Sequence, residues 1–264
     1  MDGAARLCLL QALQAFLQAV RHIRTWQDTD RLLVLLGGIA DPELRLHRLG
    51  EHLRARTPEE AAWTIARMWD RVAAGEPRTQ ETCLGLLDSK RLSRVMEADH
   101  LGAVQAVLEA DGDPSAGLFR PATSRPDFRD DVTAPRPKEP VGFRISLARQ
   151  PSPSVLDRLL FDSDVRVVRT ILGNPRLTEA EVVKLAASRR ATPEVLEVIA
   201  QDDRWLARYP VKMALANNPR TPLRVVLGLL PYLLHQDLRA VAGGSSRAEV
   251  RERAASLLSR RPGG

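Results

Sequence analysis

The stretch Leu215-Ala216-Asn217-Asn218-Pro219-Arg220-Thr221-Pro222 decides the fold of this chain, and Ile171-Leu172-Gly173-Asn174-Pro175-Arg176-Leu177-Thr178 repeats its pattern. In each stretch an apolar run ends at asparagine, and the proline that follows prevents a helix from continuing. Asparagine tolerates the left-handed backbone that closes many helices, so we expect Asn174 and Asn218 to adopt it. The threonine after each proline can cap a new helix. Both stretches therefore predict two helices joined by a tight turn.

Turns of this kind recur throughout residues 141–264. The candidate helix caps are Ser152, Thr178, Thr192, Thr221 and Ser246, which are spaced 26, 14, 29 and 25 residues apart. Three of these spacings lie near 26, and the short one marks an irregular unit. One helix pair cannot bury its apolar stripe alone, so we expect successive pairs to stack on one another.

Residues 145–258 resemble the leucine-rich repeat variant family, a bacterial relative of HEAT-like helical repeats. The resemblance is carried by Asp164-Val165-Arg166, by the turns at Asn174 and Asn218, and by Leu185-Ala186. It implies an α-solenoid of helix pairs, and it implies no particular activity. The best-known member couples such repeats to an iron–sulfur cluster held by clustered cysteines, which this chain lacks. The resemblance therefore brings no cofactor with it.

The bulk composition is that of a globular helical chain. The 264 residues are 44% apolar and 27% charged, while aromatic residues make up only 4%. Strands favour aromatic and β-branched residues, so this mixture predicts an all-α protein. The two cysteines, Cys8 and Cys83, lie in apolar runs, and the five histidines form no metal-ligand spacing. We expect buried free thiols, no metal, no cofactor and no catalytic residues.

The distribution of proline divides the chain into three segments. Residues 111–140 contain six prolines and show no helical period, which predicts an extended linker. Residues 1–110 before it predict a bundle of helices, and residues 141–264 after it predict the helical-repeat domain. A connection of this length is uncommon inside one compact domain, so we expect two domains.

The first predicted helix, Ala4 to Ile23, has one apolar stripe, formed by Leu9, Leu10, Leu13, Phe16, Leu17, Val20 and Ile23. A second predicted helix follows from Asp28 to Leu36 and ends at Gly37-Gly38. Gln11, Gln14 and Gln18 interrupt the apolar block, unlike the continuous core of a signal peptide. No stretch approaches the roughly 18 apolar residues of a membrane span. We therefore expect a cytoplasmic protein without a membrane partner.

The positive charge is concentrated in the predicted repeat domain. Residues 141–264 contain 20 basic and 12 acidic residues, a net charge of +8, while the whole chain carries only +6. A solenoid exposes a continuous face on which arginines can align. We expect the following residues to form a basic binding surface: Arg166, Arg169, Arg208, Lys212, Arg220 and Arg224. The predicted function is a non-catalytic scaffold that binds an acidic segment of a protein partner.

Two other interpretations remain open at this point. Composition alone also accounts for the arginines, as solvated side chains without a partner. Alternatively, the surface binds the phosphates of nucleic acid independently of the base sequence, in the manner of HEAT-like DNA glycosylases. Asp202-Asp203-Arg204-Trp205 offers the residue types of such an enzyme. We expect instead that an aspartate caps a helix there and that Trp205 belongs to the core.

Overall fold

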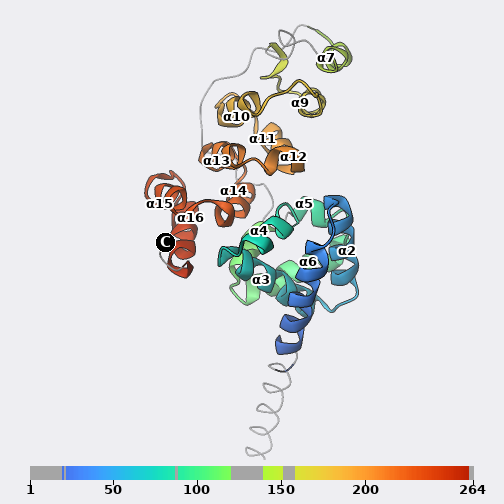
Figure 1. The fold of residues 1–264 in the computed structure, drawn as a ribbon, viewed down its shortest axis with the longest axis vertical. Helices are drawn as coiled ribbons and strands as arrows, with labels where there is room; N and C mark the ends of the chain where they lie inside the picture. The colour runs from blue at the N-terminus through green and yellow to red at the C-terminus, as the bar shows by residue number, and fades with distance from the viewer. Residues whose placement is uncertain (1–19, 21, 87–88, 120–138, 151–157, 262–264) are drawn as a thin grey trace, which may run out of the picture. The chain divides into compact units, whose positions relative to one another are not determined.

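The protein is all-helical wherever its structure is described. The computed structural model describes residues 20, 22–86, 89–119, 139–150 and 158–261 (Figure 1). Within these ranges the backbone forms helices and connecting turns, and no strand. The predicted fold class is confirmed at this level.

The chain divides into two compact units. Unit 1 comprises residues 1–72 and 76–116, and unit 2 comprises residues 73–75 and 117–264. The first helix of unit 1 spans 22–37. It is followed by α2 (Pro42–Arg54), α3 (Pro58–Ala73), α4 (Pro77–Cys83), α5 (Ser89–Leu92), α6 (Ala98–Ala110) and the 3-10 helix η1 (Pro114–Leu118).

The helix starts of unit 1 follow from local sequence. Asp41 caps α2, accepting a hydrogen bond of 2.7 Å from the Leu44 amide, and Pro42 occupies the first helical position. Thr57 and Glu60 exchange side-chain and main-chain hydrogen bonds at the start of α3, which is a capping box. The break expected between Ile23 and Asp28 is absent, because no residue there stops a helix.

The start of the predicted linker is not extended chain. Pro114–Leu118 forms η1, and the Asp113 carboxylate accepts hydrogen bonds from both the amide and the hydroxyl of Ser115. Leu118 and Phe119 are buried. The prediction of a linker from residue 111 is therefore wrong at its beginning, since an aspartate before a proline starts a short helix there. Residues 120–138 lie outside the described residues.

A half-buried histidine in unit 1, His52, predicts acid sensitivity. Burial, and to a smaller extent the positive charge of the neighbouring Arg56, lower the pKa of His52 from 6.5 to about 4. As pH falls from 6.5 towards 4, His52 becomes protonated in the unfolded chain but stays neutral in the folded protein. The free energy of unfolding therefore decreases over this pH range. We expect His52→Gln to lose less stability than the parent over this window, measured by thermal unfolding. Equal losses in the two proteins would contradict this role for His52.

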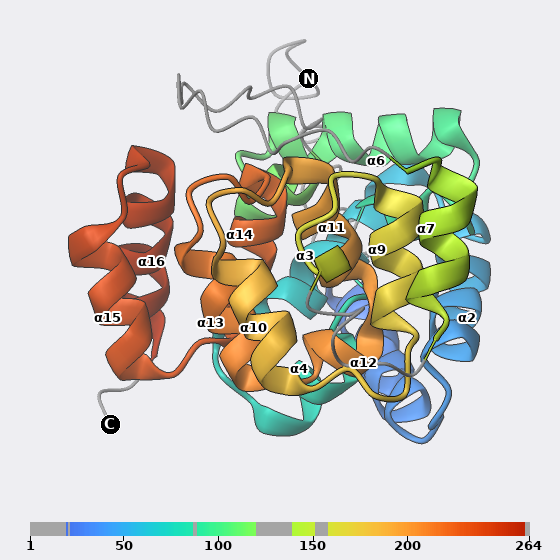
Figure 2. The ribbon, with the colours of Figure 1, turned by 90° about the horizontal axis from the view of Figure 1, so that it is seen from above.

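Unit 2 is built from short helices in two adjacent rows. They are α7 (Val141–Ala148), α9 (Val165–Leu172), α10 (Glu179–Ala187), α11 (Pro193–Gln201), α12 (Asp203–Leu206), α13 (Tyr209–Asn217), α14 (Leu223–Leu229), the 3-10 helix η2 (Leu230–Tyr232), α15 (His235–Gly244) and α16 (Ala248–Arg260). Helix α9 packs against α7 and α11, and α13 packs against α10 and α14. Figure 2 shows α7, α9 and α11 side by side. Helix α16 packs against α14 and α15.

Two of the predicted caps in unit 2 are confirmed and two are wrong. Thr178 forms a complete capping box with Glu181, and Thr192 caps α11. Thr221 instead donates its hydroxyl to the Leu215 carbonyl at 2.7 Å, and α14 starts without a side-chain cap. Ser246 is also not a cap, because the cap position of α16 is Arg247. Ser152 lies outside the described residues.

The two asparagines that decide the fold act in a way the sequence does not suggest. No described residue other than glycine has a positive φ, and Asn218 is extended, so the left-handed prediction is wrong. The Asn218 amide donates to the carbonyls of Ala186 and Ser188, at 2.7 and 3.0 Å, beside the end of α10. Asn174 repeats this arrangement on Ala148 and Gln150, beside the end of α7. Each asparagine thus joins its own turn to an earlier one.

Each asparagine also stabilises the turn in which it lies. The side-chain oxygen of Asn174 accepts a hydrogen bond from the amide of Arg176, and that of Asn218 accepts one from Arg220. Both side chains are therefore fully used, and both are buried. We call each of these asparagines, with its three hydrogen bonds, an asparagine rung. The rungs supply partners for carbonyls that a helix end leaves unpaired.

Candidate functional site

The six predicted basic residues of unit 2 do not form one surface. Arg166 lies at the start of α9 and forms an ion pair of 2.9 Å with Asp164, two residues earlier. Arg208 lies 3.8 Å from Glu179, so its charge is also partly balanced. Arg169 is exposed, and within the described chain its guanidinium has no hydrogen-bond or ion-pair partner. Only Arg169 of these three keeps an unbalanced charge.

Lys212 is half-buried on α13 rather than extended into solvent. Its ammonium donates to the Ala207 carbonyl at 3.4 Å. Burial lowers the pKa of Lys212, because a charged amine loses water when it is covered. Its position therefore makes it a poor contact for an external acidic chain.

Arg224 is the clearest correction among the six. Its side chain is only 3% exposed, and it forms an ion pair with Glu197, whose side chain is 8% exposed. A guanidinium enclosed in this way has no surface on which to meet a partner. The sequence could not show this, because Arg224 follows a turn just as the exposed arginines do.

Arg220 leads to a different group of arginines that lie on adjacent turns. Its guanidinium donates at 2.7 Å to the carbonyl of Arg189, in the turn after α10. From the next turn, Arg247 donates at 2.7 Å to the Thr221 carbonyl and also to that of Pro219. Arg251 donates at 2.8 Å to the Ser245 carbonyl beside Arg247. We call Arg189, Arg190, Arg220, Arg247 and Arg251 the arginine edge.

The arginine edge has excess positive charge. Its three turns, residues 186–191, 217–222 and 244–251, contain five arginines and one acidic residue, Glu249. Among the described residues none of the five arginines forms an ion pair. An arginine has five N–H donors, and the carbonyl contacts of Arg220 and Arg247 use only a few of them. The guanidinium donors of the exposed Arg189, Arg190 and Arg251 are available to carboxylates or phosphates, whereas Arg247 is half-buried and burial lowers its pKa.

The sequence contains a signal for the arginine edge that the six predicted residues do not reflect. Each of the three turns places an arginine two or three residues after a helix ends: Arg189 and Arg190 after α10, Arg220 after α13 and Arg247 after α15. Cations near helix C-termini also interact favourably with the helix dipole. The position of an arginine in the turn after a helix, rather than its position on the helix, indicates that it belongs to the arginine edge.

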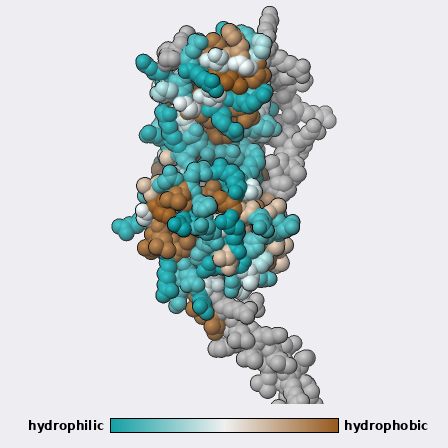
Figure 3. Space-filling model, turned by 90° about the vertical axis from the view of Figure 1, so that its right-hand side faces the viewer, coloured by the Kyte–Doolittle hydropathy of each residue, from teal (hydrophilic) through white to brown (hydrophobic). Residues whose placement is uncertain are grey.

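Other exposed arginines of unit 2 belong to different turns. Arg149 follows α7 and Arg176 follows α9, and neither guanidinium has an ion-pair partner among the residues described. The turn of Arg176 meets that of Arg149 through the Asn174 rung. Phe143 is exposed on α7, and Figure 3 shows apolar surface at this end of unit 2. This end therefore differs chemically from the arginine edge.

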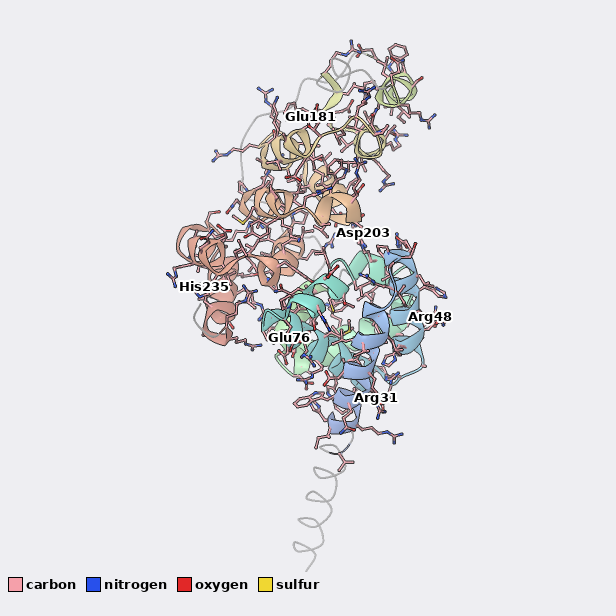
Figure 4. All side chains as sticks on the ribbon, in the orientation of Figure 1. Arg31, Arg48, Glu76, Glu181, Asp203 and His235 are labelled. Atoms are coloured by element: carbon pink, nitrogen blue, oxygen red, sulfur yellow. The ribbon has the colours of Figure 1, made fainter. Side chains whose placement is uncertain are left out.

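The residues proposed for a glycosylase-like site have structural roles. Asp202 caps α12, accepting a hydrogen bond from the Trp205 amide, and burial raises its pKa. Trp205 is buried, and its indole donates at 2.9 Å to the Leu172 carbonyl at the end of α9. Both expectations, an aspartate cap and a core tryptophan, are confirmed. Asp203 lies beside them at the start of α12 (Figure 4).

Three further features bear on chemistry. Cys83 is buried, and burial raises the pKa of its thiol to about 12, which suppresses the reactive thiolate. Across the described ranges no three His, Cys, Asp or Glu side chains cluster in a way that holds a metal ion. None of the helices found there combines the length and apolar character needed to cross a bilayer.

Comparison with known proteins adds no relative to this picture. No protein-family model matches the chain, and neither the curated proteins nor the solved structures contain a match to it.

Proposed function

We propose that unit 2 is an α-solenoid of HEAT-like, leucine-rich-repeat-variant helix pairs that acts as a non-catalytic scaffold. Its support is the pair of asparagine rungs, which lie 44 residues apart in the sequence and make the same three hydrogen bonds. The stacking of α9 between α7 and α11 agrees with this interpretation. A solenoid presents successive turns in a row, so a feature of one turn is repeated along an edge.

The partner we propose is an acidic, extended protein segment bound along the arginine edge. The observation that carries this proposal is the row of five arginines without ion-pair partners, on three turns joined by hydrogen bonds. Arg220 and Arg247 are held in place by main-chain carbonyls, so less side-chain entropy is lost when they bind an anion. The proposed site replaces the six-residue surface expected from sequence, of which it retains only Arg220.

The test compares two double charge reversals. Arg189→Glu with Arg190→Glu changes the arginine edge, and neither side chain makes a hydrogen bond or ion pair within the described residues. Arg149→Glu with Arg176→Glu introduces the same charge change elsewhere on unit 2. A fluorescent peptide of alternating Asp and Glu is titrated with the full chain, followed by anisotropy. We expect the first pair to weaken binding by about ten-fold or more and the second to have a much smaller effect.

Equal losses for both pairs would show attraction to overall charge rather than a site. A single-stranded oligonucleotide titrated in parallel separates the two partner classes. Oligonucleotide binding that exceeds peptide binding and falls steeply with salt would replace the protein partner by nucleic acid. Absence of peptide binding at low salt would overturn the proposal.

A further inference from the structure

Arginines, like the asparagines, join the turns of unit 2 by a contact that repeats. Arg220 is the third residue after α13 and donates at 2.7 Å to the carbonyl of Arg189, the second residue after α10. Arg247 is the third residue after α15 and donates to the carbonyl of Pro219, the second residue after α13. Each arginine therefore extends from its own turn to the equivalent carbonyl of the turn before it.

In the part of unit 2 that the structure describes, these contacts place three guanidinium groups in a row. That of Arg220 lies at the turn after α10, and that of Arg247 lies at the turn after α13. That of Arg251 lies at the turn after α15, where it donates at 2.8 Å to the Ser245 carbonyl. Figure 1 shows α10, α13 and α15 in this order along unit 2. We call these three groups the guanidinium row.

Helix packing sets the spacing of the guanidinium row. Helix α13 packs against α10, and packed helices lie about 8–10 Å apart. The turns that end packed helices repeat at the same distance. Since an arginine spans the next step between equivalent positions as well, the two steps have similar lengths. A partner whose carboxylates repeat about every 8–10 Å can therefore meet one guanidinium at each turn.

The polyproline II helix matches this spacing. It has three residues per turn and rises about 3.1 Å per residue, so every third side chain points the same way, about 9.3 Å further along. Side chains on one face of a β-strand repeat about every 6.7 Å, which is too short. Seven residues of an α-helix span about 10.5 Å, which is close to the required distance. Spacing alone therefore leaves two conformations for the partner.

The hydrogen-bond donors of the guanidinium row favour polyproline II over the α-helix. Arg220 and Arg247 are partly exposed, and main-chain carbonyls fix their positions while other N–H donors stay unused. A polyproline II chain makes no internal hydrogen bonds, so its carbonyls can accept from these donors between the carboxylate contacts. The carbonyls of an α-helix are already paired within the helix.

We infer that the arginine edge binds an acidic segment in the polyproline II conformation, with an aspartate or glutamate at every third residue. This inference rests on the proposed function and adds to it the conformation and the spacing of the partner. Three turns accept three acidic residues over about 19 Å of partner chain.

Peptides of equal charge test the spacing. Each fluorescent peptide contains four glutamates separated by one, two or three prolines, so all three are polyproline II helices and only the glutamate spacing differs. The full chain is titrated into each peptide and anisotropy is followed. We expect the two-proline peptide to bind at least about ten-fold more tightly than the others, because only its glutamates lie in line.

The result separates this inference from the function on which it rests. Equal affinities for the three peptides would overturn the spacing and leave the proposed function intact, since charge alone would then explain binding. Absence of binding by all three at low salt would overturn the proposed function, and this inference with it.

A fourth peptide tests the conformation. It has the glutamate spacing of the two-proline peptide, with glycine in place of every proline. Glycine leaves the free chain flexible, so more conformational entropy is lost on binding and we expect weaker affinity. A glycine peptide that binds as tightly as the two-proline peptide would overturn the polyproline II conformation.

A pair of variants tests whether the guanidinium row causes the preference. Arg220→Gln removes one of its members, so the preference for the two-proline peptide should fall to about three-fold or less. Arg176→Gln is the matched control, because Arg176 is exposed on a turn outside the arginine edge and should keep the preference. Circular dichroism should show equal helix content in both variants. An unchanged preference in Arg220→Gln would refute the guanidinium row.

Discussion

Arg224→Met is expected to destabilise unit 2 by about 3–5 kcal/mol, the cost of removing one partner of a buried ion pair. Arg224 and Glu197 are both almost fully covered, so the substitution leaves the Glu197 carboxylate in the core without this cation. Methionine has a similar length, so loss of packing contributes little. Urea unfolding followed by circular dichroism measures the change in the free energy of unfolding.

A second variant tests the cause of that loss. Arg224→Met combined with Glu197→Leu removes both charges, and replacing a buried pair by apolar residues is often neutral. We expect the double variant to recover most of the stability lost by Arg224→Met. A double variant as unstable as the single one would show that packing, rather than the unpaired charge, causes the loss.

Asn218→Ala is expected to cost on the order of 3 kcal/mol, because it leaves several main-chain groups without partners and each such group costs about 1–3 kcal/mol when buried. The groups are the carbonyls of Ala186 and Ser188 and the amide of Arg220. Asn217→Ala is the matched control. Asn217 is the exposed preceding residue at the end of α13, and its loss should change stability by less than about 0.5 kcal/mol.

Asn218→Gly distinguishes this account from the one suggested by the sequence. Glycine adopts the left-handed backbone readily, so it would restore stability if Asn218 were there to close a helix. Asn218 is extended and acts through its side chain, so glycine should be at least as destabilising as alanine. A glycine variant with the stability of the parent would refute the asparagine rung.

Local rules predicted helix starts well and long-range contacts poorly. Thr178 and Thr192 cap helices as expected, and Asp41 and Thr57 follow the same local rule, because capping involves residues only two or three positions apart. Thr221 and the two rung asparagines bond to partners whose positions depend on packing. The tight turns at Asn174 and Asn218 were predicted at the correct positions, although the left-handed backbone expected of the two asparagines was wrong.

For the candidate site, too, the sequence predicts what depends on local composition but not what depends on contacts between distant residues. Sequence indicated that the excess charge lies in residues 141–264, and the arginine edge is in that segment. It could not tell Arg224, which is buried against a glutamate 27 positions earlier, from Arg190, which is exposed. Net charge is additive along a chain, whereas the exposure of each charge depends on which helices meet. The choice among arginines therefore required the packing of α11 and α14.

The chemistry of the asparagine rungs has a consequence for how such a chain can change its length. Asn174 and Asn218 bind main-chain oxygens, which every residue type carries, and no side chain of the earlier turn takes part. These hydrogen bonds therefore do not depend on which residues supply the main-chain carbonyls. A segment containing one rung and its helices can be duplicated in frame, and the copies can then diverge freely at their surfaces while the joint between neighbours stays intact.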